Sequence, residues 1–138
     1  MNGKRILVVV VAAIIYFSIG AGWYSTFATP WLAGIGKTMA DLQAMNSGSL
    51  PYVVGFVAVL VECALLAMLV ARTGCTGWLN GAKLGAVLAI GIVGAQLALN
   101  YAFEARSVTL WLINAGYALV GLVVAGAIIG AVTPPKAP

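Results

Sequence analysis

The chain has 138 residues, of which 63% are hydrophobic and 7% are charged, and its mean hydropathy is +1.09. Soluble globular domains carry about 25% charged residues, so this composition excludes an ordinary water-soluble protein and favours lipid as the solvent. The net charge is +4, but the basic residues stand singly at the ends of apolar runs. That pattern is typical of membrane orientation signals rather than of nucleic-acid binding.

Four apolar segments are long enough to cross a bilayer, which requires about 20 residues. They cover residues 6–24, 51–71, 82–103 and 108–132. The first segment could instead be a cleaved signal peptide, but its apolar stretch is too long and it ends in Trp23-Tyr24, an aromatic pair typical of a membrane interface. We therefore expect a single domain over residues 1–138, with an all-α fold: an integral membrane four-helix bundle.

The longest segment outside these spans, residues 25–50, has apolar residues at helical spacing. They recur every three or four positions at Trp31, Ile35, Met39, Leu42 and Met45. This spacing predicts a short interfacial amphipathic helix along the outer membrane surface, between the first and second spans. Such a helix would cap the bundle; the alternative is a mobile lid over a cavity.

The charges outside the spans predict the orientation of the chain. With four spans, both termini share one side, which carries five basic residues and no acidic residue: Lys4, Arg5, Arg72, Lys83 and Lys136. The opposite side carries two basic and two acidic residues: Lys37, Arg106, Asp41 and Glu104. The positive-inside rule therefore predicts a multi-pass protein with both termini in the cytoplasm.

Glycines spaced four apart predict close helix packing. Gly81 and Gly85 form one such pair at the start of the third span, and Gly126 and Gly130 form another in the fourth. Helices in lipid associate through close backbone contact, which favours these GxxxG-like patterns. Packing within the bundle is the first interpretation, and small positions left over would allow a homo-oligomer.

Glu62 is the one ionisable residue deep within a span. A carboxylate at the bilayer centre costs about 3 kcal/mol or more, so it should face the bundle interior or water. Polar residues on the other spans could meet it: Tyr16 on the first, Gln96 and Asn100 on the third, and Asn114 and Tyr117 on the fourth. From a helical rise of about 1.5 Å per residue, these groups would form a track from the outer surface to the midplane, with Glu62 at its floor.

Two interpretations of this track stay open. In one, the polar residues form a closed hydrogen-bond network that pins the helices together. In the other, they line an outward-facing cavity for a small polar or cationic ligand or a proton. The first fits a structural or accessory membrane subunit that acts through helix–helix association, and the second fits a binding protein.

No feature of the sequence predicts an enzyme. The chain has no histidine and only two cysteines, Cys63 and Cys75, which excludes most metal sites. There is no P-loop, no dinucleotide-binding fingerprint and no Ser/His/Asp set. We therefore expect no catalytic residues, no metal and no cofactor. The expected partners are the lipid bilayer, a second copy of the chain and the small ligand, but no nucleic acid.

Two blocks of residues resemble a known family. The first is Gly20-Ala21-Gly22-Trp23-Tyr24-Ser25, followed by Phe27 and Trp31. The second is Phe103-Glu104-Ala105-Arg106-Ser107, followed by Leu110-Trp111-Leu112-Ile113-Asn114-Ala115-Gly116-Tyr117. Their order and spacing are similar to the "G-x-x-WYS…F…W" and "F-E-x-R-S…L-x-x-IN-x-GY" stretches of a bacterial membrane family called domain of unknown function 1761.

The resemblance implies a four-span protein of a bacterial cytoplasmic (inner) membrane and implies no activity. It adds Trp23, Tyr24 and Ser25 to the candidate ligand-binding residues, as one side of a site that Asn114 and Tyr117 would complete. Many members are expected to carry a histidine after the Gly-Tyr pair, where this chain has Ala118. Glu62 is not part of the shared pattern.

Overall fold

The computed structural model describes residues 3–45 and 48–135, and all regular structure in this part of the chain is helical. Four helical segments are long and apolar enough to cross a membrane: α1 (Gly3–Thr26), α4 (Leu50–Thr73), the continuous run from Trp78 to Phe103, and α7 (Val108–Val132). Each expected span lies within one of these segments, although the third begins at Trp78 rather than at residue 82. The predicted all-α membrane bundle is confirmed.

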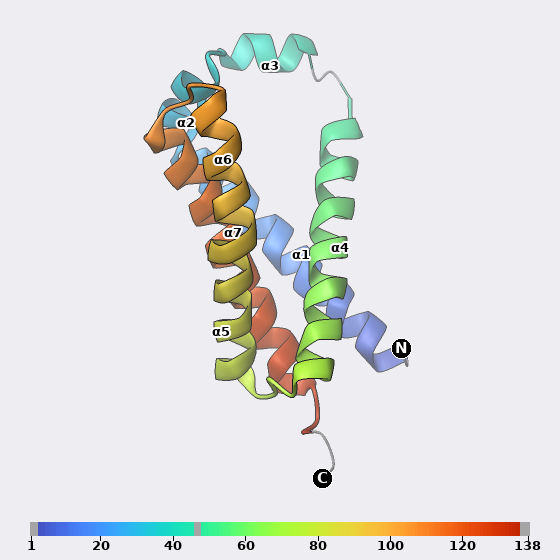
Figure 1. Cartoon of the computed structure of the whole chain (residues 1–138). Helices are drawn as coiled ribbons and strands as arrows, with labels where there is room; N and C mark the ends of the chain where they lie inside the picture. The colour runs from blue at the N-terminus through green and yellow to red at the C-terminus, as the bar shows by residue number, and fades with distance from the viewer. Residues whose placement is uncertain (1–2, 46–47, 136–138) are drawn as a thin grey trace.

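The last helix, α7, occupies the centre of the bundle. It contacts α1, α2 (Ala28–Ile35), α4, α5 (Trp78–Leu88) and the segment η1 (Ala89–Gly94). Figure 1 shows α1 crossing behind α4 and α7, while α4 stands on the other side of the bundle from α5 and α6 (Ala95–Phe103). The core is made mainly of buried residues from α1, α4 and α7, including Ala12, Tyr16, Cys63, Leu66 and Ala125, and Ala89 of η1 joins it.

Glycines bring α5 and α7 into direct backbone contact. A Cβ atom on Gly81 would collide with the carbonyl oxygen of Gly126, and one on Gly85 would collide with that of Leu122. The Gly77 N–H, just before α5, also donates a hydrogen bond to the Gly130 carbonyl oxygen at 2.8 Å. The GxxxG-like pattern therefore acts inside the chain, as the first interpretation predicted.

The segment between α1 and α4 contains two short helices, α2 and α3 (Met39–Met45), where one helix was predicted. Gly36, with a φ of +67°, ends α2 in the left-handed conformation. Thr38 and Asp41 then begin α3 with a reciprocal cap: the Thr38 N–H donates to Asp41 Oδ2 at 2.7 Å and the Asp41 N–H donates to Thr38 Oγ1 at 3.1 Å. The chain turns at Gly36, after α2 has packed on α7, and neither α2 nor α3 contains a fully buried residue.

A π-helical segment, η1, interrupts the third long helix and was not predicted. The Trp111 Nε1–H, on α7, donates a hydrogen bond to the Gly94 carbonyl oxygen at 2.9 Å. A π-turn disturbs the regular helical hydrogen bonds, so this bond from a neighbouring helix satisfies a carbonyl group at the disturbed site.

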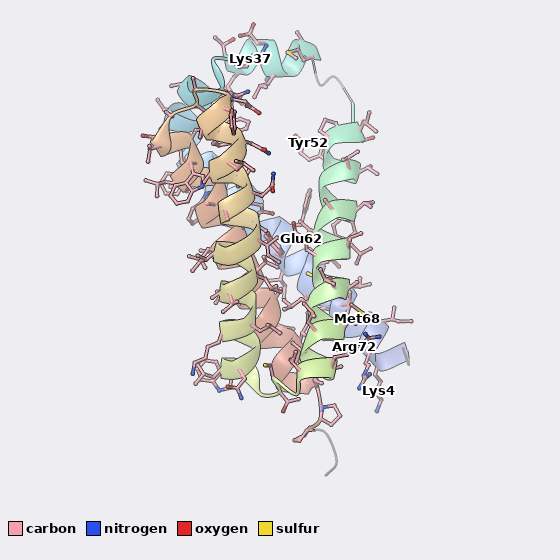
Figure 2. The ribbon with its side chains drawn as sticks, viewed as in Figure 1. Lys4, Lys37, Tyr52, Glu62, Met68 and Arg72 are labelled. Atoms are coloured by element: carbon pink, nitrogen blue, oxygen red, sulfur yellow. The ribbon has the colours of Figure 1, made fainter. Side chains whose placement is uncertain are left out.

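Apart from Glu62, the charged residues lie toward the two ends of the bundle. Figure 2 shows Lys4 and Arg72 at one end and Lys37 at the other. We call the first the basic end and the second the α3 end. The predicted fifth cation of the basic side, Lys136, lies outside the described residues.

Candidate functional site

Glu62 lies near the middle of α4, on the side that faces the other helices (Figure 2). Its neighbours along this side of α4, Val59, Cys63 and Leu66, are buried in the core. One carboxyl oxygen, Oε2, is buried and has no hydrogen-bond partner among the described residues. Leaving a buried acceptor unpaired costs about 1–3 kcal/mol, and more for a charged group. The fold therefore retains a polar atom that its own side chains leave unsatisfied.

Two tyrosines interact with this carboxyl group. Tyr16 of α1 lies beside Glu62, and Tyr117 of α7 is also close enough to interact with it electrostatically. The Tyr16 and Tyr117 ring centroids are 5.1 Å apart. The Tyr16 ring is only 2% exposed and rests against Gly121, where a Cβ atom would overlap the ring. A glycine in α7 thus makes the space that holds Tyr16 next to Glu62.

A second group of polar residues lies toward the α3 end. The Tyr24 hydroxyl donates a hydrogen bond to Asn114 Oδ1 at 3.0 Å, and Asn114 Nδ2 donates one to the Tyr101 hydroxyl at 2.7 Å. The Tyr24 ring is 5.3 Å from that of Tyr117. The rings of Tyr16, Tyr117 and Tyr24 therefore form a line that connects Glu62 to this network.

Tyr101 was not among the predicted site residues. One feature of the sequence could have indicated Tyr101 as a site residue. It directly follows Asn100 and lies one turn before Glu104, at the end of the third span. Sequence alone favoured Asn100 as the partner on this helix, because spacing along one helix does not say which of two adjacent residues faces α7.

The other predicted residues of the third span stand apart from this network. Gln96 Nε2 donates a hydrogen bond to Asn100 Oδ1 at 3.2 Å, and both side chains are exposed. The predicted track is thus divided between a partly buried set on α1, α6 and α7 and an exposed amide pair on α6. Amides at this depth avoid lipid and face water or another protein surface.

Trp23 and Ser25, two other predicted site residues, donate hydrogen bonds to backbone carbonyl groups of the chain. The Trp23 Nε1–H donates to the Ile113 carbonyl oxygen at 2.9 Å, and the indole ring covers Gly116, where a Cβ would lie 2.8 Å from it. The Ser25 hydroxyl donates to the Ala21 carbonyl oxygen of its own helix at 2.6 Å. The end of α1 and the beginning of α7 therefore face each other, through Trp23 and Tyr24.

Glu62 lines neither of two grooves on the surface of the described residues. The first, of about 890 Å³, lies at the basic end between α1, α4 and α7. The second, of about 630 Å³, lies at the α3 end around Gly34 and Arg106. Within the described ranges, no three His, Cys, Asp or Glu side chains gather in a way that could hold a metal ion.

A model of the family described as protein of unknown function (DUF1761) matches residues 7–130. The chain belongs to the DUF1761 family. The match includes Tyr16, Glu62 and the Tyr24–Asn114–Tyr101 network, and the family description assigns no activity to any of them. Searches of curated proteins and of solved structures found no match.

Proposed function

We propose that this DUF1761 protein binds a small lipophilic cation at Glu62, in a cytoplasmic (inner) membrane with both termini on the cytoplasmic side. The observation that carries the proposal is the buried Oε2 atom of Glu62, which has no hydrogen-bond partner in the described chain. A bound cation would satisfy this oxygen, and a carboxylate deep in a membrane segment is by default a functional group.

The tyrosines beside Glu62 suit a cation as well. A cation is attracted to the face of an aromatic ring within about 6 Å of its centroid. Tyr16 and Tyr117 lie within interaction range of the carboxyl group, and Tyr24 continues the line of rings toward the α3 end. A carboxylate together with tyrosine rings favours an organic cation over a strongly hydrated metal ion.

The structure of α4 suggests how a ligand would reach Glu62. The buried residues of α4 begin at Val59, while residues 50–54 are all exposed. At the same end, α6 carries the exposed amides of Gln96 and Asn100. Weak packing of this half of α4 would let it move away from the bundle, so we infer that the ligand enters from the α3 end, past these amides.

Binding of tetraphenylphosphonium to the purified protein tests this proposal, with tetraphenylborate as an anion of the same shape. We expect the phosphonium to bind and Glu62→Gln to weaken it at least tenfold. Glu104→Gln removes an acid at the surface, where the carboxylate is paired with Arg106 at 2.8 Å, and should leave binding unchanged. Equal binding of both probes, or no effect of Glu62→Gln, would overturn the proposal.

A structural or accessory subunit is the second candidate, because the exposed amides of Gln96 and Asn100 could meet another protein. It is less favoured because the glycine pairs of α5 and α7 already face each other within one chain. An Asn100→Cys variant, with Cys63 and Cys75 replaced by alanine, separates the two. Labelling by a water-soluble maleimide supports the cavity, whereas disulfide crosslinking between copies supports association.

A further inference from the structure

The larger groove lies at the basic end, opposite the entry proposed for the cation. Its floor is apolar, with Val8 and Val9 from α1, Ala64 and Ala67 from α4, and Ile129 from α7. Three cationic residues line it as well: Lys4, Arg5 and Arg72. Its volume of about 890 Å³ falls in the range of roughly 300–1,000 Å³ that ligand pockets occupy.

We propose that this groove binds an anionic phospholipid, with the phosphate between Lys4 and Arg72 and an acyl chain along the apolar floor. None of the described residues that line the groove is acidic, so its charge is complementary to a phosphate. The guanidinium group of Arg72 can hold two phosphate oxygens at once, and the Lys4 ammonium adds a point charge. Figure 2 shows Lys4, Met68 and Arg72 together at this end.

The polar and apolar ends of the groove are arranged as the headgroup and acyl chains of a membrane lipid are. Its cations are near the end of α4, whereas Ala64 lies about 12 Å deeper at a rise of about 1.5 Å per residue. The polar end therefore lies at the membrane surface and the apolar end points to the midplane. A soluble phosphate compound would contact Lys4 and Arg72 and leave the apolar floor uncovered, and a neutral lipid would cover the floor but offer no anion to Lys4 and Arg72.

Alanines on α4 make the floor available. Ala64, Ala67 and Ala71 all line the groove, and their small side chains leave a trough between α1 and α4. A bulky side chain at Ala71 would fill the trough without removing a charge. This gives a test of the acyl-chain contact that is separate from the test of the phosphate contact.

The experiment compares spin-labelled phosphatidylglycerol and phosphatidylcholine on the intact protein in lipid nanodiscs, and measures the motionally restricted fraction of each. We expect phosphatidylglycerol to be preferred, and the double variant Lys4→Gln/Arg72→Gln to reduce that preference about tenfold or more, since each basic residue near an anionic surface contributes on the order of fivefold. The matched control, Lys37→Gln/Lys83→Gln, removes the same charge from two residues outside the groove and should preserve the preference.

A variant that fills the groove tests the acyl-chain contact separately from the phosphate contact. Ala71→Phe should release both lipids from the restricted fraction, whereas Ala58→Phe, at an exposed position on the other half of α4, should not. Equal loss of preference in the two charge variants would show that the cations only orient the protein, and would overturn the proposal. Displacement of the bound lipid by millimolar glycerol phosphate would overturn it too, since a soluble phosphate would then be the ligand.

Discussion

Gly81 of α5 and Gly126 of α7 lie backbone to backbone, so that a Cβ atom on either would meet the carbonyl oxygen of the other. Because both contacts are with helix backbone, an added Cβ atom can be accommodated only if the two helices move apart. We expect Gly126→Ala to lower the free energy of unfolding by about 3 kcal/mol, at the upper end of what overpacking costs. Reversible unfolding of the detergent-solubilised protein in SDS would measure this loss.

Gly22→Ala is the matched control for that substitution. Gly22 is also helical, but a Cβ there meets nothing within 4 Å. Alanine is the better helix former by about 0.8–1.0 kcal/mol, so this variant should unfold at the same or slightly higher SDS concentration. Similar losses in both variants would show that the α5–α7 contact does not hold the bundle together.

We expect a substitution at Gly121 to weaken ligand binding at Glu62, because the Tyr16 ring lies between the two residues. Gly121→Ala puts a methyl group where the Tyr16 ring lies, so we expect a loss of about 1–3 kcal/mol of stability together with weaker tetraphenylphosphonium binding. In a Tyr16→Leu background the added methyl group has more room. A double-mutant cycle should therefore give a coupling of about 1 kcal/mol, and a coupling of zero would show that Gly121 does not pack against the Tyr16 ring.

The Tyr24–Asn114–Tyr101 network should contribute modestly to stability. Side-chain hydrogen bonds between membrane helices average about 0.6 kcal/mol, so Tyr24→Phe should cost about that much and Asn114→Ala about twice as much. Once Asn114 is gone, Tyr24→Phe should have no further effect on the unfolding free energy. Tyr52→Phe, at a tyrosine that is 69% exposed, is the control and should change nothing.

The cap of α3 predicts a pH dependence at the membrane surface. Hydrogen bonds from the hydroxyl and N–H of Thr38 hold the pKa of Asp41 below its usual 3.8. Because the folded pKa is lowered, the cap is complete above about pH 4 and is lost as the pH falls through the folded value. Amide protection at Thr38 and Leu42 should fall in that window, and Asp41→Ala, which removes the acceptor, should make protection low and independent of pH.

The spans and the glycine contact could be predicted because each depends on a local pattern: about 20 apolar residues for a span and a four-residue repeat for close packing. The break between α2 and α3 was also visible, since Gly36 permits the left-handed turn and Thr38-x-x-Asp41 is a capping pattern. The apolar spacing across both helices outweighed these signals and suggested one helix.

The grouping of the polar residues could not be predicted, because it depends on how far each helix is rotated about its axis. Asn100 and Tyr101 are adjacent in sequence, yet Tyr101 bonds to Asn114 and Asn100 bonds to Gln96. The π-helical segment within the third span adds to this difficulty, because it shifts the faces of α6 relative to those of α5. No residue pattern in Ala89–Gly94 signals that shift.

The central position of α7 has a consequence for how the protein is made. Synthesis runs from the N-terminus, so α1 and α4 are made before α7, and α7 supplies Gly121, the backbone on which the Tyr16 ring rests. When Glu62 enters the bilayer, Tyr16 has therefore been made but Tyr117 has not. The high hydropathy of α4, 2.7, favours insertion of this helix despite its carboxyl group. The bundle closes only when its final helix arrives.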